Sequence, residues 1–200
     1  MGDTPAADKP LTDRLLRSWS RCRRRAWLDR HGDQSGRVYT AHRTLQLDDQ
    51  QRSFVALLPR KPGHGLAACE RGDVGVVGLR LRGRTAEGQS LEAHPALLQR
   101  QPGRSRWGDY VYRPVLARQG RRLTREHRLQ LALSARLLAS YQQAPVNAGL
   151  AVAGAGRHLE KNTVALGENL QRQLDDALRK LAADLAVSYT HLRAHETDRY

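Results

Sequence analysis

Residues 91–99 (LEAHPALLQ), 108–118 (GDYVYRPVLAR) and 124–134 (TREHRLQLALS) decide how this chain folds. The pattern of the first two segments is typical of strands. The third segment begins with a threonine that can cap a helix, and its broad apolar face continues to about Gln143, before Pro145 breaks the helix. Two adjacent strands followed by a long helix predict the centre of a mixed α/β domain.

Apolar periodicity and helix-breaking residues predict the other elements. The segment 11–31 reads as one helix that Gly32 ends, with an apolar seam of Leu15, Trp19, Cys22 and Ala26. The remaining predicted elements are a short helix from Asp48 or Asp49 to Leu58, a helix that ends at Gly72, a strand at 73–82, a turn at 83–90, a polar loop at 101–107, strands at 146–153 and 159–166, and a helix at 168–186. This order predicts helices packed on a small mixed sheet.

The chain carries a strong positive charge. It has 34 Lys and Arg residues against 20 Asp and Glu residues, a net charge of +14 and an isoelectric point near 10.9. Such a charge repels itself in the folded state, so it predicts an anionic partner, with nucleic acid as the first candidate. No segment approaches the roughly 20 apolar residues of a membrane span, and no apolar signal segment follows Met1. We therefore expect a cytoplasmic protein without a membrane partner, with Cys22 and Cys69 reduced.

The length and composition fit one domain. Residues 1–10 are expected to be a disordered lead, and residues 11–186 a domain large enough to bury a sizeable core. Residues 187–197 (VSYTHLRAHET) resemble one reading frame of a transposon adapter used in preparing DNA sequencing libraries, so we interpret 187–200 as a non-native tail. On this interpretation the natural chain continues beyond residue 186, and a downstream domain of the same protein is a candidate partner.

The order of the predicted elements resembles the RecB-like branch of the PD-(D/E)XK nucleases. In that family a Pro-Asp pair ends one strand, an acid-x-Lys motif lies on the next strand, and Gln-x-x-x-Tyr lies on the following helix. The corresponding positions here are Pro95 and Ala96, 116–118 (Leu-Ala-Arg) and 130–134 (QLALS), where the proline and the glutamine match. Residues 18–32 (SWSRCRRRAWLDRHG) also resemble the family's N-terminal helix. The resemblance implies a restriction-endonuclease-like α/β fold, a small mixed sheet flanked by helices.

The substitutions remove the groups with which the family cuts DNA. The family's acids hold Mg²⁺ through carboxylate oxygens, and the metal activates the attacking water. Ala96 and Leu116 offer no oxygen ligand, so Mg²⁺ is implied for an active relative, whereas neither a metal site nor a cofactor is expected here. Arg118 keeps the positive charge of the family's lysine and can clamp a phosphate, but it cannot accept a proton. We assign a catalytic role to none of the family positions, which are Ala96, Leu116, Arg118, Gln130 and Ser134.

Other acids are conceivable replacements for the missing ones. Glu92 and His94 share a strand face with Ala96 if the strand is regular, and Asp109 opens the neighbouring strand. A migrated site is therefore geometrically conceivable. Exposed acids more often only solvate a surface, however, so we favour a site without hydrolytic chemistry.

Two functional hypotheses follow, and the sequence contains neither a P-loop nor a zinc-binding pattern that would suggest other chemistry. The first is the N-terminal domain of a metal-dependent RecB-like nuclease. The second, which the residues at 96 and 116 favour, is a nuclease-derived module that binds DNA through arginines with weak or lost phosphodiester hydrolysis. A basic module that binds a protein or ribosomal RNA surface is a third alternative. The predicted nucleic-acid contacts are Arg21, Arg24, Arg25, Arg104, Arg106, Arg118, Arg122, Arg125 and Gln130.

Overall fold

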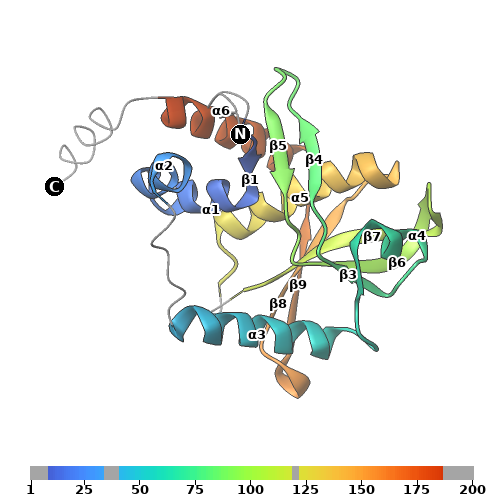
Figure 1. Cartoon of the computed structure of the whole chain (residues 1–200). Coiled ribbons are helices and arrows are strands. Elements are labelled where there is room, and N and C mark those ends of the chain that lie inside the picture. The colour runs from blue at the N-terminus through green and yellow to red at the C-terminus, as the bar shows by residue number, and fades with distance from the viewer. Residues whose placement is uncertain (1–8, 34–40, 119–121, 187–200) are drawn as a thin grey trace.

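A computed structural model describes residues 9–33, 41–118 and 122–186. The predicted tail at 187–200 and residues 1–8 of the predicted lead lie outside the described residues. Within the described ranges the chain forms helices packed around two sheets, as expected for the α/β class (Figure 1). None of the helices in this part of the chain is long and apolar enough to cross a membrane.

The larger sheet has six strands in the order β2-β3-β6-β7-β8-β9. β6 and β7 form a long antiparallel hairpin, β8 lies parallel to β7, and β9 returns antiparallel to β8. A parallel pair requires a crossover, and α5 (Arg125–Gln142) provides it between β7 and β8. The strands are β2 (Gly63–His64), β3 (Gly75–Val77), β6 (Leu97–Ser105), β7 (Gly108–Ala117), β8 (Ala148–Ala153) and β9 (Glu160–Ala165).

Helices cover both faces of the larger sheet (Figure 1). α3 (Ala41–Leu57) covers one face, where the core cluster consists of Phe54, Leu58, Leu97, Val115, Leu150 and Val152. α5 covers the other face, and Leu98 and Tyr112 belong to the larger core cluster around it. Because successive side chains of a strand alternate between faces, neighbours such as Leu97 and Leu98 lie in different clusters.

The smaller sheet has three strands in the order β1-β5-β4, and the β4–β5 hairpin stands out from the body of the molecule (Figure 1). One face of this sheet packs on α5: Leu81 is buried, and the Tyr141 hydroxyl accepts a hydrogen bond of 3.1 Å from the Arg82 backbone N–H. The strands are β1 (Leu11–Thr12), β4 (Leu81–Arg84) and β5 (Ser90–Ala93).

Two predicted strands are each divided between the two sheets, which corrects the sequence predictions. The predicted strand 91–99 is divided between β5 and β6, which belong to different sheets. Pro95 lies at the division, because it has no backbone donor and restricts the residue before it. The predicted strand 73–82 is likewise divided between β3 and β4 at Gly78, which adopts a left-handed φ of 71°. A side chain at position 78 would also collide with the ring of His64, so only glycine fits this turn between the sheets.

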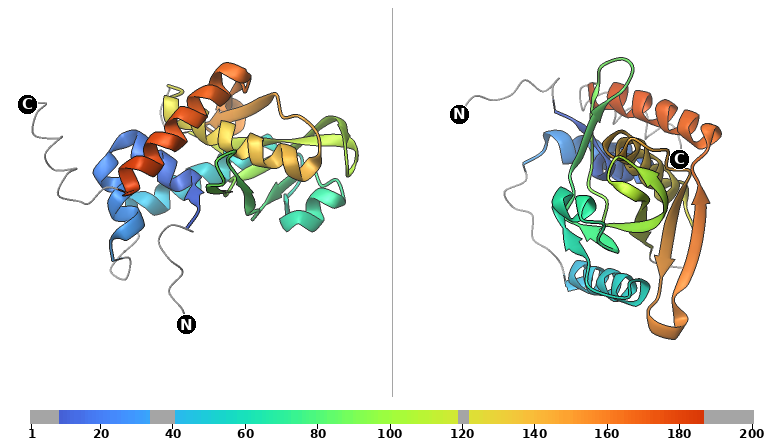
Figure 2. Two further views of the ribbon diagram at one scale, coloured as in Figure 1. Left: turned by 90° about the horizontal axis from the view of Figure 1, so that it is seen from above. Right: turned by 90° about the vertical axis from the view of Figure 1, so that its right-hand side faces the viewer.

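The predicted helix 11–31 is two helices, α1 (Asp13–Arg21) and α2 (Arg23–His31). Cys22 between them has extended backbone angles, φ −160° and ψ 119°, so its side chain leaves the predicted apolar seam and is exposed. The other seam residues, Leu15, Trp19 and Ala26, are buried as predicted. α6 (Glu168–Ala186) lies across α1 and α2 (Figure 2), and its Asp184 accepts a hydrogen bond of 2.6 Å from the Trp19 indole N–H.

The elements of the C-terminal half confirm the sequence predictions most closely. α5, β8, β9 and α6 all occur where the periodicity places them, and α6 has the predicted bounds. Two segments differ: the predicted loop 101–107 is mostly the end of β6, and the helix predicted from Asp48 or Asp49 is the longer α3. α4 (Gly65–Glu70) is the predicted helix before Gly72, and a short 3-10 helix (Gly156–His158) joins β8 to β9. Both cysteines are free, and burial raises the pKa of the Cys69 thiol to about 12.

Gln142, the last residue of α5, completes the edge of β7. β8 pairs with β7 from Val115 to Ala117, so an earlier N–H on this edge of β7, that of Tyr112, needs another acceptor. The side-chain Oε1 of Gln142 accepts a hydrogen bond of 2.9 Å from the Tyr112 N–H, and its backbone carbonyl accepts one from Arg106. Gln142 is completely buried, so these bonds replace the missing strand inside the core.

Candidate nucleic-acid interface

The positions of the family's two strand acids lie on opposite faces of the larger sheet. β6 and β7 pair so that Leu97 is opposite Val115, and both side chains belong to the cluster beneath α3. Leu116, the next residue of β7, packs against the core around α5. Ala96 precedes β6 and packs on the α3 side, beside Phe54. Side chains at these two positions would therefore point away from one another, with the sheet between them.

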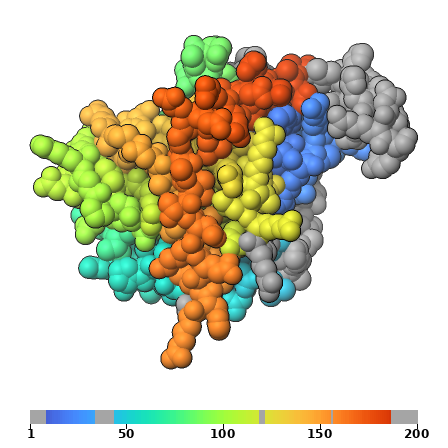
Figure 3. Space-filling model, turned by 180° about the vertical axis from the view of Figure 1, so that it is seen from behind, coloured from blue at the N-terminus to red at the C-terminus, as the bar shows by residue number. Residues whose placement is uncertain are grey.

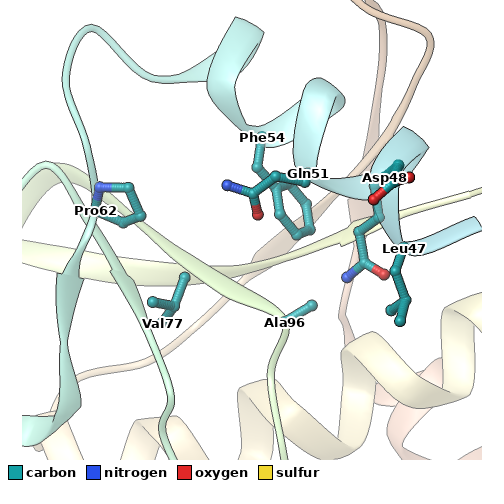
Figure 4. Close-up of a pocket in the computed structure, with 8 residues that line it drawn as sticks. Leu47, Asp48, Gln51, Phe54, Pro62, Val77 and Ala96 are labelled. Carbon is teal, nitrogen blue, oxygen red and sulfur yellow. The ribbon is translucent and has the colours of Figure 1, made fainter. Parts of the chain in front are cut away.

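Ala96 lines a cavity of about 420 Å³ between α3 and the sheet (Figure 4). Of the described residues that line it, Asp48 alone carries a carboxylate. Elsewhere in the described ranges, too, no three His, Cys, Asp or Glu side chains form a group that could hold a metal ion. The cavity thus offers a single carboxylate among amide and apolar side chains. Its lining residues are Leu47, Asp48, Gln50, Gln51, Phe54, Pro62, Val77 and Ala96.

Arg118 is buried, which corrects the expectation that it clamps a phosphate. Its guanidinium forms an ion pair with Glu160 and donates a hydrogen bond of 2.9 Å to Oδ1 of Asn162, both on β9. Its backbone N–H donates to the carbonyl of Val152 at 2.7 Å. The charge of Arg118 is thus compensated within the fold, where it ties the end of β7 to β8 and β9.

The helix positions of the motif share a sheet face with Leu116 and not with Ala96. Gln130 and Ser134 lie one turn apart on α5, where Gln130 is half-buried and Ser134 is buried. α5 packs on the face that also bears Leu116. The structure therefore brings together the positions of the second and third family motifs and leaves the first motif on the other face.

We expect no Mg²⁺- or Mn²⁺-dependent cleavage, measured as nicking of supercoiled plasmid, from the unmodified protein. Introducing the nuclease residues that the resemblance suggests, with Ala96→Asp, Leu116→Asp and Arg118→Lys, should not produce cleavage either, because the new carboxylates lie on opposite faces and cannot hold one cation. Ala96→Asp alone avoids burying a second acid and tests the cavity directly, since it places a carboxylate near Asp48. Nicking by Ala96→Asp that disappears on adding Asp48→Asn would overturn this expectation and locate a metal site in the cavity.

The residues considered for a migrated site do not converge. Glu92 and His94 lie in or beside β5, and Glu92 Oε1 is 3.1 Å from His94 Nε2. The partner on the other side of the imidazole is Asp13, whose Oδ1 is 3.4 Å from Nδ1, and the sequence prediction missed this residue. Asp109 lies at the far end of β7 in the other sheet, and Ala96 does not share a strand with Glu92. The expectation that these residues share one strand face is therefore wrong, because the chain changes sheets after His94.

Arg21 joins α1 to the first turn of α5. Its guanidinium donates two hydrogen bonds to the Glu126 carboxylate, at 2.6 and 2.5 Å. This is the bidentate geometry in which a planar guanidinium matches a carboxylate. Burial would raise the pKa of the Glu126 carboxyl, but the hydrogen bonds from Arg21 and the charges of Arg21, His127 and Arg17 outweigh it and lower the pKa. Glu126 therefore remains ionised and holds one face of Arg21, whose side chain is still 48% exposed.

His127 caps the same helix turn as a neutral imidazole. Its Nδ1 accepts a hydrogen bond of 3.2 Å from the Thr124 backbone N–H, which completes a capping box. Burial lowers the pKa of His127; Glu126 opposes this, and the charges of Arg17, Arg21 and Arg118 add to it. The α5 start is thus a point where arginines from two segments, α1 and the end of β7, lie close enough to affect the pKa of one histidine.

The exposed arginines of α1 and α2 lie beside this point. α1 and α2 together contain seven arginines and two aspartates. In the space-filling view the blue α1–α2 segment lies directly beside the yellow start of α5 (Figure 3), where the Arg21–Glu126 pair connects them. We call this surface the α2 arginine surface, and its exposed members are Arg21, Arg23, Arg24, Arg25, Arg122 and Arg125.

The two other predicted contacts, Arg104 and Arg106, lie elsewhere. They are exposed at the turn between β6 and β7, and the Arg106 N–H donates to the carbonyl of Gln142 at the C-terminal end of α5. Arg122 and Arg125 lie at the other end of this helix, about 27 Å away for 18 residues. The structure thus separates the predicted arginines into two groups.

The sequence prediction missed a third group of arginines, Arg80, Arg82 and Arg84. They alternate with Leu81 and Gly83 along the outer hairpin, and all three are exposed. The signal was present in the letters RLRGR, because arginine at every second position of a strand places the charges on one face. It was overlooked because the predicted strand ended at residue 82, which assigned Arg84 to a turn.

No protein-family model matches this chain, and no curated protein matches it.

Proposed function

We propose that this chain is a nucleic-acid-binding domain, derived from a RecB-like nuclease, that holds the phosphate backbone through arginines and does not hydrolyse it. The observation that carries the proposal is the α2 arginine surface, whose exposed arginines lie on α1, on α2 and at the start of α5, with the Arg21–Glu126 pair joining α1 to α5. Arginine suits this role because it stays charged and presents several N–H donors to phosphate oxygens.

The nuclease ancestry is supported by the order of the elements. The β6–β7 hairpin is followed by α5, which is the order of two strands and a helix that the resemblance implies, and the parallel strand β8 makes the sheet a mixed one. A restriction-endonuclease-like core is thus the fold we propose for residues 97–153. The loss of hydrolysis is supported by the placement of Ala96 and Leu116 on opposite faces.

A second property of the site supports contact with the backbone alone. Glu126 and Asp184 hold Arg21 and Arg23 in place, yet the two arginine side chains remain 48% and 58% exposed. Phosphate contacts fix position without reading sequence. We therefore propose binding with little sequence preference.

We expect the protein to bind duplex DNA with an affinity that falls steeply with salt, because each phosphate that is neutralised releases counterions. Replacing Arg24, Arg25 and Arg122 with glutamine should lower the slope of log affinity against log salt by roughly 2 to 3 and weaken binding roughly tenfold or more at moderate salt. Fluorescence anisotropy over a salt series measures both quantities.

The control is an equal loss of charge on the other side of the larger sheet. Arg52, Arg60 and Lys61 are exposed on or just after α3, and their replacement with glutamine removes the same three charges. We expect this variant to keep nearly the wild-type slope. An affinity that stays flat between low and moderate salt, or equal losses in both variants, would contradict the proposed surface.

A further inference from the structure

The outer face of the β4–β5 hairpin carries a row of arginines. Arg80, Arg82 and Arg84 alternate with Leu81 and Gly83, whose face packs on α5. A Cβ on Gly83 would lie 2.5 Å from the Leu137 side chain, which shows how closely this inner face approaches the helix. The three arginines therefore point to the other side of the sheet, about 6.7 Å apart along the strand.

A buried carboxylate positions two of these arginines. Arg82 is opposite Glu92 in the β4–β5 register, and Glu92 is only 4% exposed. The Nε atoms of Arg80 and Arg82 lie 2.7 and 3.2 Å from Glu92 Oε2, while their side chains remain 57% and 63% exposed. One carboxylate thus orders two guanidinium groups and neutralises the charge of one.

Glu92 is itself held in its charged form. Burial would raise the pKa of its carboxyl, but hydrogen bonds from Arg80 and Arg82 and the charges of Arg80 and His94 outweigh burial and lower it. His94 lies 3.1 Å from Glu92 and continues the network to Asp13 at the start of α1. The network connects the hairpin to α1, whose other end bears Arg21 of the α2 arginine surface.

The chemistry of this face fits a phosphodiester backbone. The positions are preordered, so less side-chain freedom is lost when an anion binds. The sequences of β4 (LRGR) and β5 (SLEA) contain no aromatic residue. Proteins that hold single strands rely on bases stacked on aromatic side chains, so this face suits a duplex that is contacted through its phosphates.

We infer that Arg80, Arg82 and Arg84 form a second phosphate-binding surface, which contacts the backbone of a duplex nucleic acid that also lies on the α2 arginine surface. This inference rests on the proposed function. α1 spans nine residues, about 13 Å, so one duplex can reach both surfaces. The second surface increases the affinity for the duplex and fixes the orientation of the duplex on the protein, without reading its sequence.

The decisive experiment measures duplex and single-strand binding over a salt series for Arg80→Gln/Arg82→Gln/Arg84→Gln in the full chain. For duplex DNA we expect the slope of log affinity against log salt to fall by roughly 2 to 3. For a single strand of the same length we expect a smaller change. The variant of Arg52, Arg60 and Lys61 is again the equal-charge control.

Loss of both arginine partners of Glu92 could unfold the hairpin, so two further variants are informative. Arg84 lies outside the Glu92 network, and Arg84→Gln alone should lower the slope by about 0.9. Glu92→Gln keeps the shape of the side chain and removes the charge that offsets Arg80 and Arg82. It should therefore steepen the slope and tighten duplex binding severalfold, a gain that a merely structural role would not produce.

The outcomes separate the two proposals. If the wild type binds duplex DNA, and Arg84→Gln and Glu92→Gln leave its slope unchanged, the second surface is wrong while the proposed function stands. If the wild type does not bind duplex DNA at all, both are wrong. Equal losses for single-stranded and duplex DNA would reject the duplex as the occupant.

Discussion

Replacing Leu133 with alanine is expected to lower the free energy of unfolding by about 2–5 kcal/mol. Leu133 is completely buried on α5, the helix that packs on the larger sheet, the hairpin of the smaller sheet, α1 and α6. Eleven of the 18 residues of α5 are buried, so the surrounding elements have little freedom to close a cavity. A domain of this kind is stable by about 5–15 kcal/mol, so this single change would remove a large part of the total.

The measurement is urea denaturation followed by far-UV circular dichroism, with the m-value compared to confirm that both proteins unfold in the same way. Leu45→Ala on α3 removes the same atoms from a side chain that is 61% exposed. We expect this control to change the free energy of unfolding by less than about 0.5 kcal/mol. Equal losses at the two positions would mean that α5 is not the centre of the core.

Replacing Gln142 with leucine is expected to lower the free energy of unfolding by about 1–3 kcal/mol. Leucine has nearly the volume of glutamine, so the loss comes from hydrogen bonds and not from a cavity. Oε1 of Gln142 is the acceptor for the buried Tyr112 N–H at 2.9 Å, and its Nε2 donates to the carbonyl of Ala144 at 3.3 Å. Leucine leaves the buried Tyr112 N–H without this acceptor, and water cannot replace it beside the fully buried position 142.

Hydrogen exchange locates the effect. The Tyr112 amide should exchange much faster in Gln142→Leu, and the near-ultraviolet circular dichroism should change, because Trp107 and Tyr112 form an edge-on ring pair at 5.9 Å. Gln173→Leu makes the same chemical change at an exposed position of α6 and should leave stability and exchange unaltered. Unchanged protection of Tyr112 in Gln142→Leu would show that the β7 edge has another acceptor.

The sequence predicted correctly those helices whose first and last residues are set by neighbouring residues in the chain. α6 begins at Glu168 and ends at Ala186 as its leucine repeat predicts, and α5 follows Thr124 and stops before Pro145. Helical periodicity and the backbone of proline act within a few residues, so one segment contains the information. The same reasoning failed at Cys22, where an extended residue divides a continuous apolar pattern into two helices.

The candidate site was less predictable, because it depends on which strand pairs with which. The stretch 91–99 reads as one strand, yet the chain passes from the smaller sheet to the larger one at Pro95. That passage moves Ala96 to the face opposite Leu116 and separates Glu92 from Asp109. The burial of Arg118 likewise depends on Glu160, 42 residues away in the sequence.

The sequence by itself determined a basic α/β chain, the types of most of its helices and strands, and the absence of carboxylates at positions 96 and 116. Only the tertiary structure decided which arginines are held outward and which are neutralised inside. The physical reason is that the periodicity of a helix or strand determines on which face of that element a side chain lies. Whether the side chain is exposed depends on what another element packs against that face.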